Sequence, residues 1–450
     1  MRARHFLALF ALVAIALPTH GSDQIPAKPQ DHPILLSGGD VYTVSGDVIR
    51  NGQVLFDKGK IVSVGQHVDG SSGAQVIDCT GKRVYPGLID ASTDIGLVEI
   101  DSIRATRDGA ETGQVNPNVR AEVAVNPDSE LIPVARTNGV LLSVTVPTGG
   151  LLSGTSALIQ LDGWTWEDMT VKAPVAMHLV WPGMAPRRAW WMRETEAEQA
   201  KKREESLRQI TQIFSDARAY LDATKADGPA SGADSPAMRP DFDARWNAML
   251  PLLRREIPLV VSADEVQQIQ GAVAFAQKQN VRLIILGGYD APLCADLLRK
   301  YHVPVIVDGV QRLPQRRGSA YDEPFTLPQR LRELGIPFAI SGSRGASLAR
   351  NLPYHAATAV AFGLPADEAL RSITLYPAQI LGVSERVGSI EPGKDATLIV
   401  CNGDVLETPT HVEQAFVQGR AIDLSNRQTR LWEKYREKYR RLAPQNSASR

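Results

Sequence analysis

The sequence is poor in cysteine, in excess charge and in long apolar runs, and each absence excludes a class of protein. Only three cysteines occur in 450 residues, too few for a disulfide-based framework. The 49 Lys and Arg residues against 50 Asp and Glu residues give a net charge of -1, so no positively charged footprint for nucleic acid is expected. An apolar content of 43% with 22% charged residues is that of an ordinary globular protein.

The N-terminus carries an apolar run that is too short to cross a membrane. Arg2 and Arg4 precede this run at residues 6–17, and small and polar residues follow it. A spanning helix needs ~20 apolar residues, so the pattern predicts a signal peptide at residues 1–21 without stable membrane insertion. No cysteine lies near the expected cut around Gly21, so lipid attachment has no acceptor. The mature protein is therefore expected in the periplasm or outside the cell.

Two of the cysteines, Cys79 and Cys401, fall in segments that are assigned below to one small domain. A single bridge between them is one hypothesis, and three buried thiols, with Cys294 as the third, is the other.

Both ends of the chain show the alternation of apolar and polar residues that is typical of antiparallel strands. It runs through residues 22–85, as in GQVLFDKGKIVSVG, and returns at residues 385–425, as in GKDATLIVCNGDVLE. Strands from the two ends can complete one sheet, so one small β-sandwich domain built from both termini is predicted. Residues 426–450 predict a basic helix and a tail.

The middle of the chain, residues 86–384, contains short apolar runs separated by helical stretches. Such runs, rich in Val and Ile, indicate parallel strands that are buried on both faces. Their repetition predicts a (β/α)8 TIM-like barrel, while a doubly wound open sheet is the alternative, although no GxGxxG motif follows any run. The runs are GVLLSVTVP, VAMHLVWP, IPLVVSAD, VRLIILGGYD, VPVIVDG and IPFAISGS.

One insertion interrupts this pattern. Residues 190–223 predict a long charged helix, and the Gly-, Ala- and Pro-rich residues that follow predict a mobile loop. The helix is interpreted either as a lid over the barrel mouth or as an outer barrel helix.

Two motifs stand in a fixed order along the chain. They are VYPGLID after the first β segment and, after the last barrel strand, GLPADEALRSITLYPAQILGVSERVGSIEPGKDATLIV at residues 363–400. Together they resemble the amidohydrolase superfamily, in the branch that includes imidazolonepropionases and some dipeptidases. The resemblance implies a (β/α)8 barrel with a β-sandwich from both termini, and metal-dependent hydrolysis of carbon–nitrogen bonds. It also implies metal ligands: two histidines on the first strand, Lys or Glu on the fourth, histidines on the fifth and sixth, and Asp on the eighth.

The positions that match the family's metal ligands hold other residues here. They are Ser92, Asp94, Ser262, Gly288 and Gly342. Zinc prefers imidazole, thiolate and carboxylate ligands, and of this set only Asp94 is one. The usual zinc chemistry is therefore not expected.

Other residues are candidates for a reduced site. His178, in the middle of VAMHLVW, is the one histidine predicted inside the barrel, either as a ligand or as a buried, hydrogen-bonded core residue. Asp94, Asp264, Asp290 and Asp308 lie at or beyond strand ends, where barrel active sites form or where carboxylates cap helices. The catalytic candidates are Asp94, His178 and Asp290, and the cofactor expected at most is one divalent ion such as magnesium, calcium or manganese.

The glycine-rich stretch after the second strand is the candidate substrate-binding loop. Gly149, Gly150, Ser153 and Gly154 allow unusual backbone angles, and exposed amides there bind carbonyl or carboxylate oxygens. A turn-rich connection is the alternative. Arg104, Arg107 and Arg120 are interpreted either as a clamp for an anionic substrate or as residues that bind neighbouring backbone.

Two functions follow from these patterns. The first is an exported hydrolase that acts on a carbon–nitrogen bond of a small amide, a cyclic amide or a dipeptide, with a reduced or atypical metal site. The second is a non-catalytic pseudoenzyme that binds a small ligand, forms a homo-oligomer or pairs with an active amidohydrolase. The expected partner molecule is a small amide or dipeptide.

Overall fold

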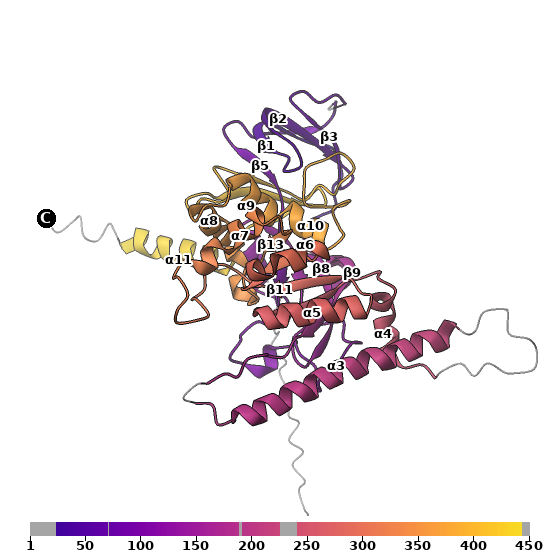
Figure 1. Cartoon of the computed structure of the whole chain (residues 1–450). Helices are drawn as coiled ribbons and strands as arrows, with labels where there is room; N and C mark the ends of the chain where they lie inside the picture. The colour runs from indigo at the N-terminus through magenta and orange to yellow at the C-terminus, as the bar shows by residue number, and fades with distance from the viewer. Residues whose placement is uncertain (1–23, 71, 189–190, 226–240, 443–450) are drawn as a thin grey trace, which may run out of the picture.

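The computed structural model describes residues 24–70, 72–188, 191–225 and 241–442 (Figure 1). The predicted signal peptide at residues 1–21 lies outside the described residues, as do residues 226–240 of the predicted mobile loop. Within the described ranges, no helix combines the length and the apolar character that crossing a membrane requires.

Eight strands form the sheet of the barrel, in the order β13-β12-β11-β10-β9-β8-β7-β6. The first and last strands, β6 and β13, lie close to each other, so the sheet is nearly closed. The TIM-like barrel predicted from the sequence is confirmed. Its strands are β6 (Leu88–Thr93), β7 (Val140–Thr145), β8 (Leu152–Gln160), β9 (Thr170–Val180), β10 (Leu259–Ala263), β11 (Leu283–Gly287), β12 (Val305–Val307) and β13 (Phe338–Ile340).

One strand departs from a regular (β/α)8 barrel. β8 pairs antiparallel with both β7 and β9, whereas the other neighbouring pairs in this sheet are parallel. Only residues 146–151 connect β7 to β8, and a parallel crossover needs about a dozen residues or more. The chain therefore turns back as a hairpin, and the predicted substrate-binding loop becomes the start of a strand.

The core divides into the barrel interior and the shell between barrel and helices. Val260, Ile284 and Ile306 pack inside the barrel, whereas their neighbours along the strands, such as Leu259 and Ile285, pack in the outer cluster with helix residues. The period of two along each strand produces this division. The helices are α1 (Leu131–Arg136), α2 (Trp166–Met169), α3 (Glu196–Lys225), α4 (Ala244–Leu253), α5 (Val266–Lys278), α6 (Ala295–Lys300), α7 (Glu323–Glu333), α8 (Leu352–Ala361), α9 (Ala366–Ser372) and α10 (Leu375–Ile380), with short 3-10 turns η1 (Arg104–Thr106), η2 (Ala121–Ala124), η3 (Ala291–Cys294) and η4 (Ala346–Asn351).

The second sheet joins the two ends of the chain, as predicted. Its order is β16-β15-β14-β5-β1-β2-β3, with β4 paired to β1. β5 from the N-terminal part pairs antiparallel with β14 from the C-terminal part, so Tyr85 lies opposite Ile399. β5 continues directly into β6, which places this domain at the N-terminal end of the barrel strands. Its strands are β1 (Ile34–Tyr42), β2 (Val48–Asp57), β3 (Lys60–Gly65), β4 (Gln75–Asp78), β5 (Arg83–Pro86), β14 (Leu398–Cys401), β15 (Val412–Val417) and β16 (Arg420–Ala421).

The hypothesis of a bridge between Cys79 and Cys401 is wrong, because both cysteines are free and buried. Cys79 packs in the cluster with Leu36 and Val400, whereas Cys401 packs in the cluster that faces the barrel. The two thiols therefore lie on opposite faces of one sheet. Cys294 is also free and buried, and burial raises the pKa of all three thiols.

Helix α3 is an outer barrel helix over its C-terminal half. Ile210, Phe214 and Leu221 are buried against the barrel shell, and the ring centroid of Phe214 lies 4.9 Å from that of Phe275 on α5. Figure 1 shows α3 running past the body of the barrel, at the end of the molecule opposite the small β domain. The N-terminal turns of α3, before Ile210, contain no buried apolar residue that packs on the barrel.

The C-terminal helix α11 (Arg427–Leu442) projects from the body (Figure 1) and contains no buried residue. It is anchored at its start, where the side chain of Asn426 accepts a hydrogen bond from the N–H of Thr429 and donates one to the hydroxyl of Thr137.

A buried carboxylate, Asp162, joins the barrel to the small β domain. Its oxygens lie 3.0 Å from Arg136 Nη1 and 3.3 Å from Arg420 Nη1, and its side chain is 2% exposed. Asp162→Asn is expected to lower the free energy of unfolding by about 3–5 kcal/mol, because it leaves the buried guanidinium of Arg136 without a counterion.

Urea unfolding of the two proteins measures this difference. The matched control is Asp367→Asn, since Asp367 pairs with Arg371 but its side chain is 64% exposed, and its loss is expected to cost less than about 1 kcal/mol. Equal effects of the two substitutions would contradict the prediction.

Candidate functional site

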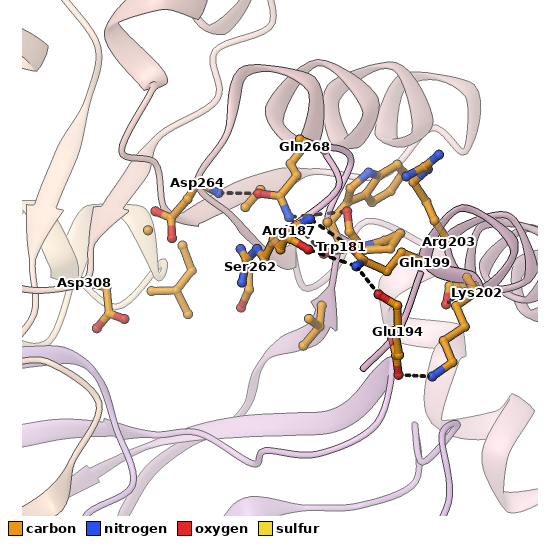
Figure 2. A pocket seen from close by; sticks show the side chains of 18 of the residues that line it. Trp181, Arg187, Glu194, Gln199, Lys202, Arg203, Ser262, Asp264, Gln268 and Asp308 are labelled. Carbon is orange, nitrogen blue, oxygen red and sulfur yellow. Dashed lines mark hydrogen bonds and ion pairs between the residues drawn. The ribbon is translucent and has the colours of Figure 1, made fainter. Parts of the chain in front are cut away.

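A cavity of about 540 Å³ opens at the C-terminal ends of β9 to β13 (Figure 2). This is the end of a barrel at which active sites form, and the volume suits a small molecule. The barrel side of the cavity is lined by Ser262, Asp264, Gly287, Asp308 and Arg344. The other side comes from the end of β9 and from the segment that contains α3.

Arg344 lies across the mouth of the barrel. Its Nη2 donates a hydrogen bond of 2.8 Å to Ser262 Oγ, and its backbone N–H donates to Asp308 Oδ1 at 3.3 Å. Its Nε lies 3.9 Å from Asp308 Oδ2. The preceding Ser343 has φ of 66°, a left-handed conformation that non-glycine residues rarely adopt. A guanidinium is therefore held over the ends of β10 and β12.

The second wall is fastened to α3 by Gln199. Its side chain accepts a hydrogen bond from the N–H of Arg187 and donates one to the carbonyl of Arg187, each at 2.9 Å. Lys202 pairs with Glu194 on the same wall (Figure 2). The interpretation as an outer barrel helix is confirmed for the C-terminal half of α3, which packs on the barrel. The N-terminal turns of α3 line the cavity, and the lid interpretation stays a prediction.

Gln268 connects the two walls. Its Nε2 donates to the carbonyl of Trp181 at 3.2 Å, while its Oε1 accepts from the N–H of Asp264 at 3.1 Å. Gln268 is buried at the start of α5, where the capping box of Glu265 positions it. The ends of β9 and β10 are fixed in this way.

The residues at the family's ligand positions do not form a metal site. Ser92 is buried behind the mouth, and Gly288 and Gly342 have no side chain to offer. Ser262 lines the cavity but accepts the hydrogen bond from Arg344. Asp94 Oδ1 accepts from the N–H of Ala346 and so ties β6 to the loop after β13.

The three catalytic candidates, Asp94, His178 and Asp290, lie in three separate places. His178 is buried in β9, and its Nε2 is 2.8 Å from Ser156 Oγ. Asp290 accepts two hydrogen bonds from Arg316 and one from the N–H of Val266, outside the cavity. Each candidate has its own partner, and no two of them face a common point in the cavity lining.

The glycines of the candidate substrate-binding loop allow backbone segments to approach each other. Gly154 has φ of 119°, and a Cβ there would lie 2.5 Å from the carbonyl oxygen of Val119. A Cβ at Gly150 would lie 2.8 Å from the carbonyl oxygen of Gln114. These residues, with Gly149 and Ser153, pack β8 against residues 110–120 and do not line the cavity.

The arginines singled out from the sequence also lie elsewhere. Arg120 pairs with Glu122 at 2.7 Å, Arg107 lies 3.8 Å from Asp101, and Arg104 is exposed in η1. The arginines that do line the cavity are Arg187, Arg203 and Arg344. Arg344 lies in the loop after the last barrel strand, β13. Loops that follow barrel strands form the active-site end, so the sequence pattern could have indicated this residue.

The donor set does not fit the metal centre that the family resemblance implies. Among the described residues, no group of three or more His, Cys, Asp or Glu side chains is placed to hold a metal ion. A catalytic zinc takes three protein ligands, usually with imidazole or carboxylate among them. The carboxylates that line the cavity are those of Glu194, Asp264 and Asp308, and each of them faces a cation: Lys202, Arg312 and Arg344 respectively.

The neutral state of His178 is testable through stability. Burial, together with the nearby charge of Arg344, lowers the pKa of His178 from 6.5 to about 3. Between these values the unfolded chain binds a proton that the folded protein does not, so this residue destabilises the protein as the pH falls below 6.5. Relative to His178→Gln, the wild type is expected to lose about 1.4 kcal/mol of unfolding free energy per pH unit between pH 5.5 and 4.5.

Urea unfolding of both proteins across this range measures the difference. His355, whose pKa is lowered to about 4 mainly by burial, is present in both proteins, so its contribution cancels. A difference that does not change with pH would show that His178 is charged in the folded protein.

Comparison with known proteins agrees with this architecture. The family model described as "Amidohydrolase family" matches residues 321–422. The chain is 22% identical over 397 residues to amidohydrolase tasK of Hapsidospora irregularis, which covers 82% of this chain and 40% of that protein. It is 38% identical over 76 residues to the imidazolonepropionase of Staphylococcus aureus strain JH9, which covers 17% of this chain and 18% of that protein. The chain thus spans less than half the length of these curated relatives.

A solved structure is similar over nearly its whole length. The crystal structure of an amidohydrolase from Thermotoga maritima MSB8 is 25% identical, with a TM-score of 0.76, and the match covers 87% of this chain and 99% of that one. The structural match over 87% of this chain agrees with the fold described above, and the family model covers the motif at residues 363–400. The chain is a member of the amidohydrolase superfamily, a superfamily of hydrolases.

Proposed function

We propose that this chain binds a small amide- or peptide-like ligand at the barrel mouth and does not carry out the zinc-dependent hydrolysis of its superfamily. The observation that carries this proposal is the hydrogen bond from Arg344 to Ser262 at the barrel mouth, because Ser262 occupies the position of a family metal ligand. One positive charge is already present there. A second cation in contact with a guanidinium is unfavourable in a partly buried site.

The remaining side chains do not replace the lost chemistry. A bound zinc ion lowers the pKa of water from 15.7 to about 7, which supplies hydroxide at neutral pH. His178, with a pKa of about 3, is too weak a base to take a proton from ordinary water. Glu194 pairs with Lys202, and Asp308 accepts a hydrogen bond from the backbone of Arg344. The geometry therefore favours binding without turnover, as in a partner subunit of an active amidohydrolase.

The second candidate function is hydrolysis of a carbon–nitrogen bond with a reduced metal site. The observation that favours it is that Asp264 and Asp308 line the same cavity. Two carboxylates with water ligands suit an oxygen-preferring ion such as magnesium or manganese better than zinc. In this function Asp264 and Asp308 would replace Asp94 and Asp290, which the cavity does not include.

Export is part of the proposal and rests on residues 1–21 alone. An oxidising compartment is compatible with the three cysteines, since all of them are free and buried in the folded protein. Cell fractionation of the native host, with detection of a mature chain that starts near residue 22, would test it.

Metal content and turnover separate the two functions. Protein purified without chelator and resupplied with zinc, magnesium or manganese is expected to hold less than about 0.1 equivalent of any of them, because a stable site needs a full ligand set. No hydrolysis of a panel of dipeptides, N-acyl amino acids and hydantoins is expected above a buffer control. Elemental analysis and amine release are the measurements.

A stoichiometric ion together with metal-dependent turnover would overturn the proposed function and support the second candidate. In that case Asp264→Asn and Asp308→Asn should each abolish turnover, whereas Asp290→Asn, outside the cavity, should leave it in place.

A further inference from the structure

The charges that line the cavity identify the chemical class of its ligand. This inference rests on the proposed binding function. The lining contains four cations, Arg187, Lys202, Arg203 and Arg344, and three acids, Glu194, Asp264 and Asp308. Lys202 pairs with Glu194, and Arg344 faces Asp308. Positive charge remains on the wall that Arg187 and Arg203 share.

The guanidinium groups of Arg187 and Arg203 form no ion pair with any residue of the described ranges. Several neighbouring cations of the insertion are paired: Arg188 with Glu196, Lys202 with Glu194 and Arg208 with Glu204. Arg193, like Arg187 and Arg203, has no ion pair with a described residue. Of these three unpaired arginines, Arg187 and Arg203 line the cavity and Arg193 does not (Figure 2). The other two arginines of this set, Arg188 and Arg208, do not line it.

The position of Arg187 is fixed by its backbone. Gln199 holds both its N–H and its carbonyl, as described above, so the side chain extends from an anchored point. Arg203 lies on α3, one helical turn after Gln199, in the part of the helix that lines the cavity. A planar guanidinium forms two parallel hydrogen bonds with a carboxylate, which makes such a pair an effective carboxylate site.

The barrel side of the cavity offers complementary groups. Asp264 Oδ1 accepts a hydrogen bond from the N–H of Tyr289 at 3.2 Å and lies 3.9 Å from Arg312 Nη2. The side chain is 37% exposed, so its other oxygen can accept a hydrogen bond from a ligand N–H. Arg344, which lines the same cavity, is held by Ser262 and Asp308. Apolar lining from Val180, Trp181, Met192 and Leu286 lies between the polar groups.

We propose that the cavity binds a small carboxylate with an amide, such as an N-acyl amino acid or a dipeptide. Arg187 and Arg203 bind its carboxylate, Asp264 accepts from its amide N–H, and Arg344 donates to its acyl oxygen. The superfamily's metal ion and Arg344 are alternative sources of positive charge at the mouth, and this chain uses the arginine.

Calorimetric titration of the mature chain, residues 22–450, tests the proposal with two matched probes. N-acetyl-L-leucine carries the carboxylate, and N-acetyl-L-leucinamide replaces it by a neutral group of the same shape. The carboxylate is expected to bind at least about tenfold more tightly, with an affinity that weakens as salt is raised. Arg187→Gln and Arg203→Gln are each expected to weaken binding by about tenfold or more.

The matched control is Arg208→Gln, because Arg208 lies on the same helix but outside the cavity, and its affinity is expected to be unchanged. Arg203→Lys keeps the charge and should retain part of the affinity, which separates a charge effect from misfolding. Equal affinity for the two probes, no binding of either, or binding of inorganic phosphate alone would overturn the carboxylate assignment. Equal affinity for the two probes would leave the proposed binding function in place, whereas binding of neither probe would count against that function as well. The two failures are therefore distinguishable.

Discussion

The seam between the first and last barrel strands fixes the geometry of the barrel mouth. β13 is only three residues long, so few backbone hydrogen bonds can close the barrel there. Side chains close it instead: Asp90 accepts from the N–H of Gly342 at 3.1 Å, and Asp94 accepts from the N–H of Ala346. The N–H of Asp94 in turn donates to the carbonyl of Arg344 at 2.8 Å. These contacts set the path of residues 342–346.

The same seam explains why the mouth is built around a guanidinium. The path of residues 342–346 directs Arg344 over the ends of β10 and β12, where Ser262 and Asp308 hold it. Burial raises the pKa of Asp90 to about 7, despite the N–H groups of Gly342 and Ser92 that favour its charged form. The Asp90 carboxyl group suits this structural role, because it is buried and its Oδ1 already accepts hydrogen bonds from the N–H groups of Gly342 and Ser92. The first strand of this chain thus positions the last loop.

Much of the architecture was predictable, because it depends on local patterns. The alternation at both ends predicted one small β domain, and the pairing of β5 with β14 confirms it. The apolar runs rich in Val and Ile predicted the barrel strands, since a strand that is buried on both faces needs such residues at every position. The missing imidazoles at Ser92, Ser262 and Gly342 were visible in the residues themselves. The sequence does not reveal the hairpin of β8, because its glycines resemble those of a binding loop and only the pairing of β8 with β7 and β9 shows the reversal of the chain.

The sequence by itself determined which of the family's ligand residues are absent, because a side chain that is absent from the chain cannot be supplied by folding. It also determined the barrel and the joined termini, since the periods of the apolar residues specify buried faces. Only the tertiary structure decided where the charges meet. Arg187, Arg203, Asp264 and Arg344 are separated by up to 157 positions, and nothing in their local sequences relates them. Their meeting at one cavity follows from the parallel strands, which bring their carboxyl ends to the same edge, and from α3, which returns over that edge.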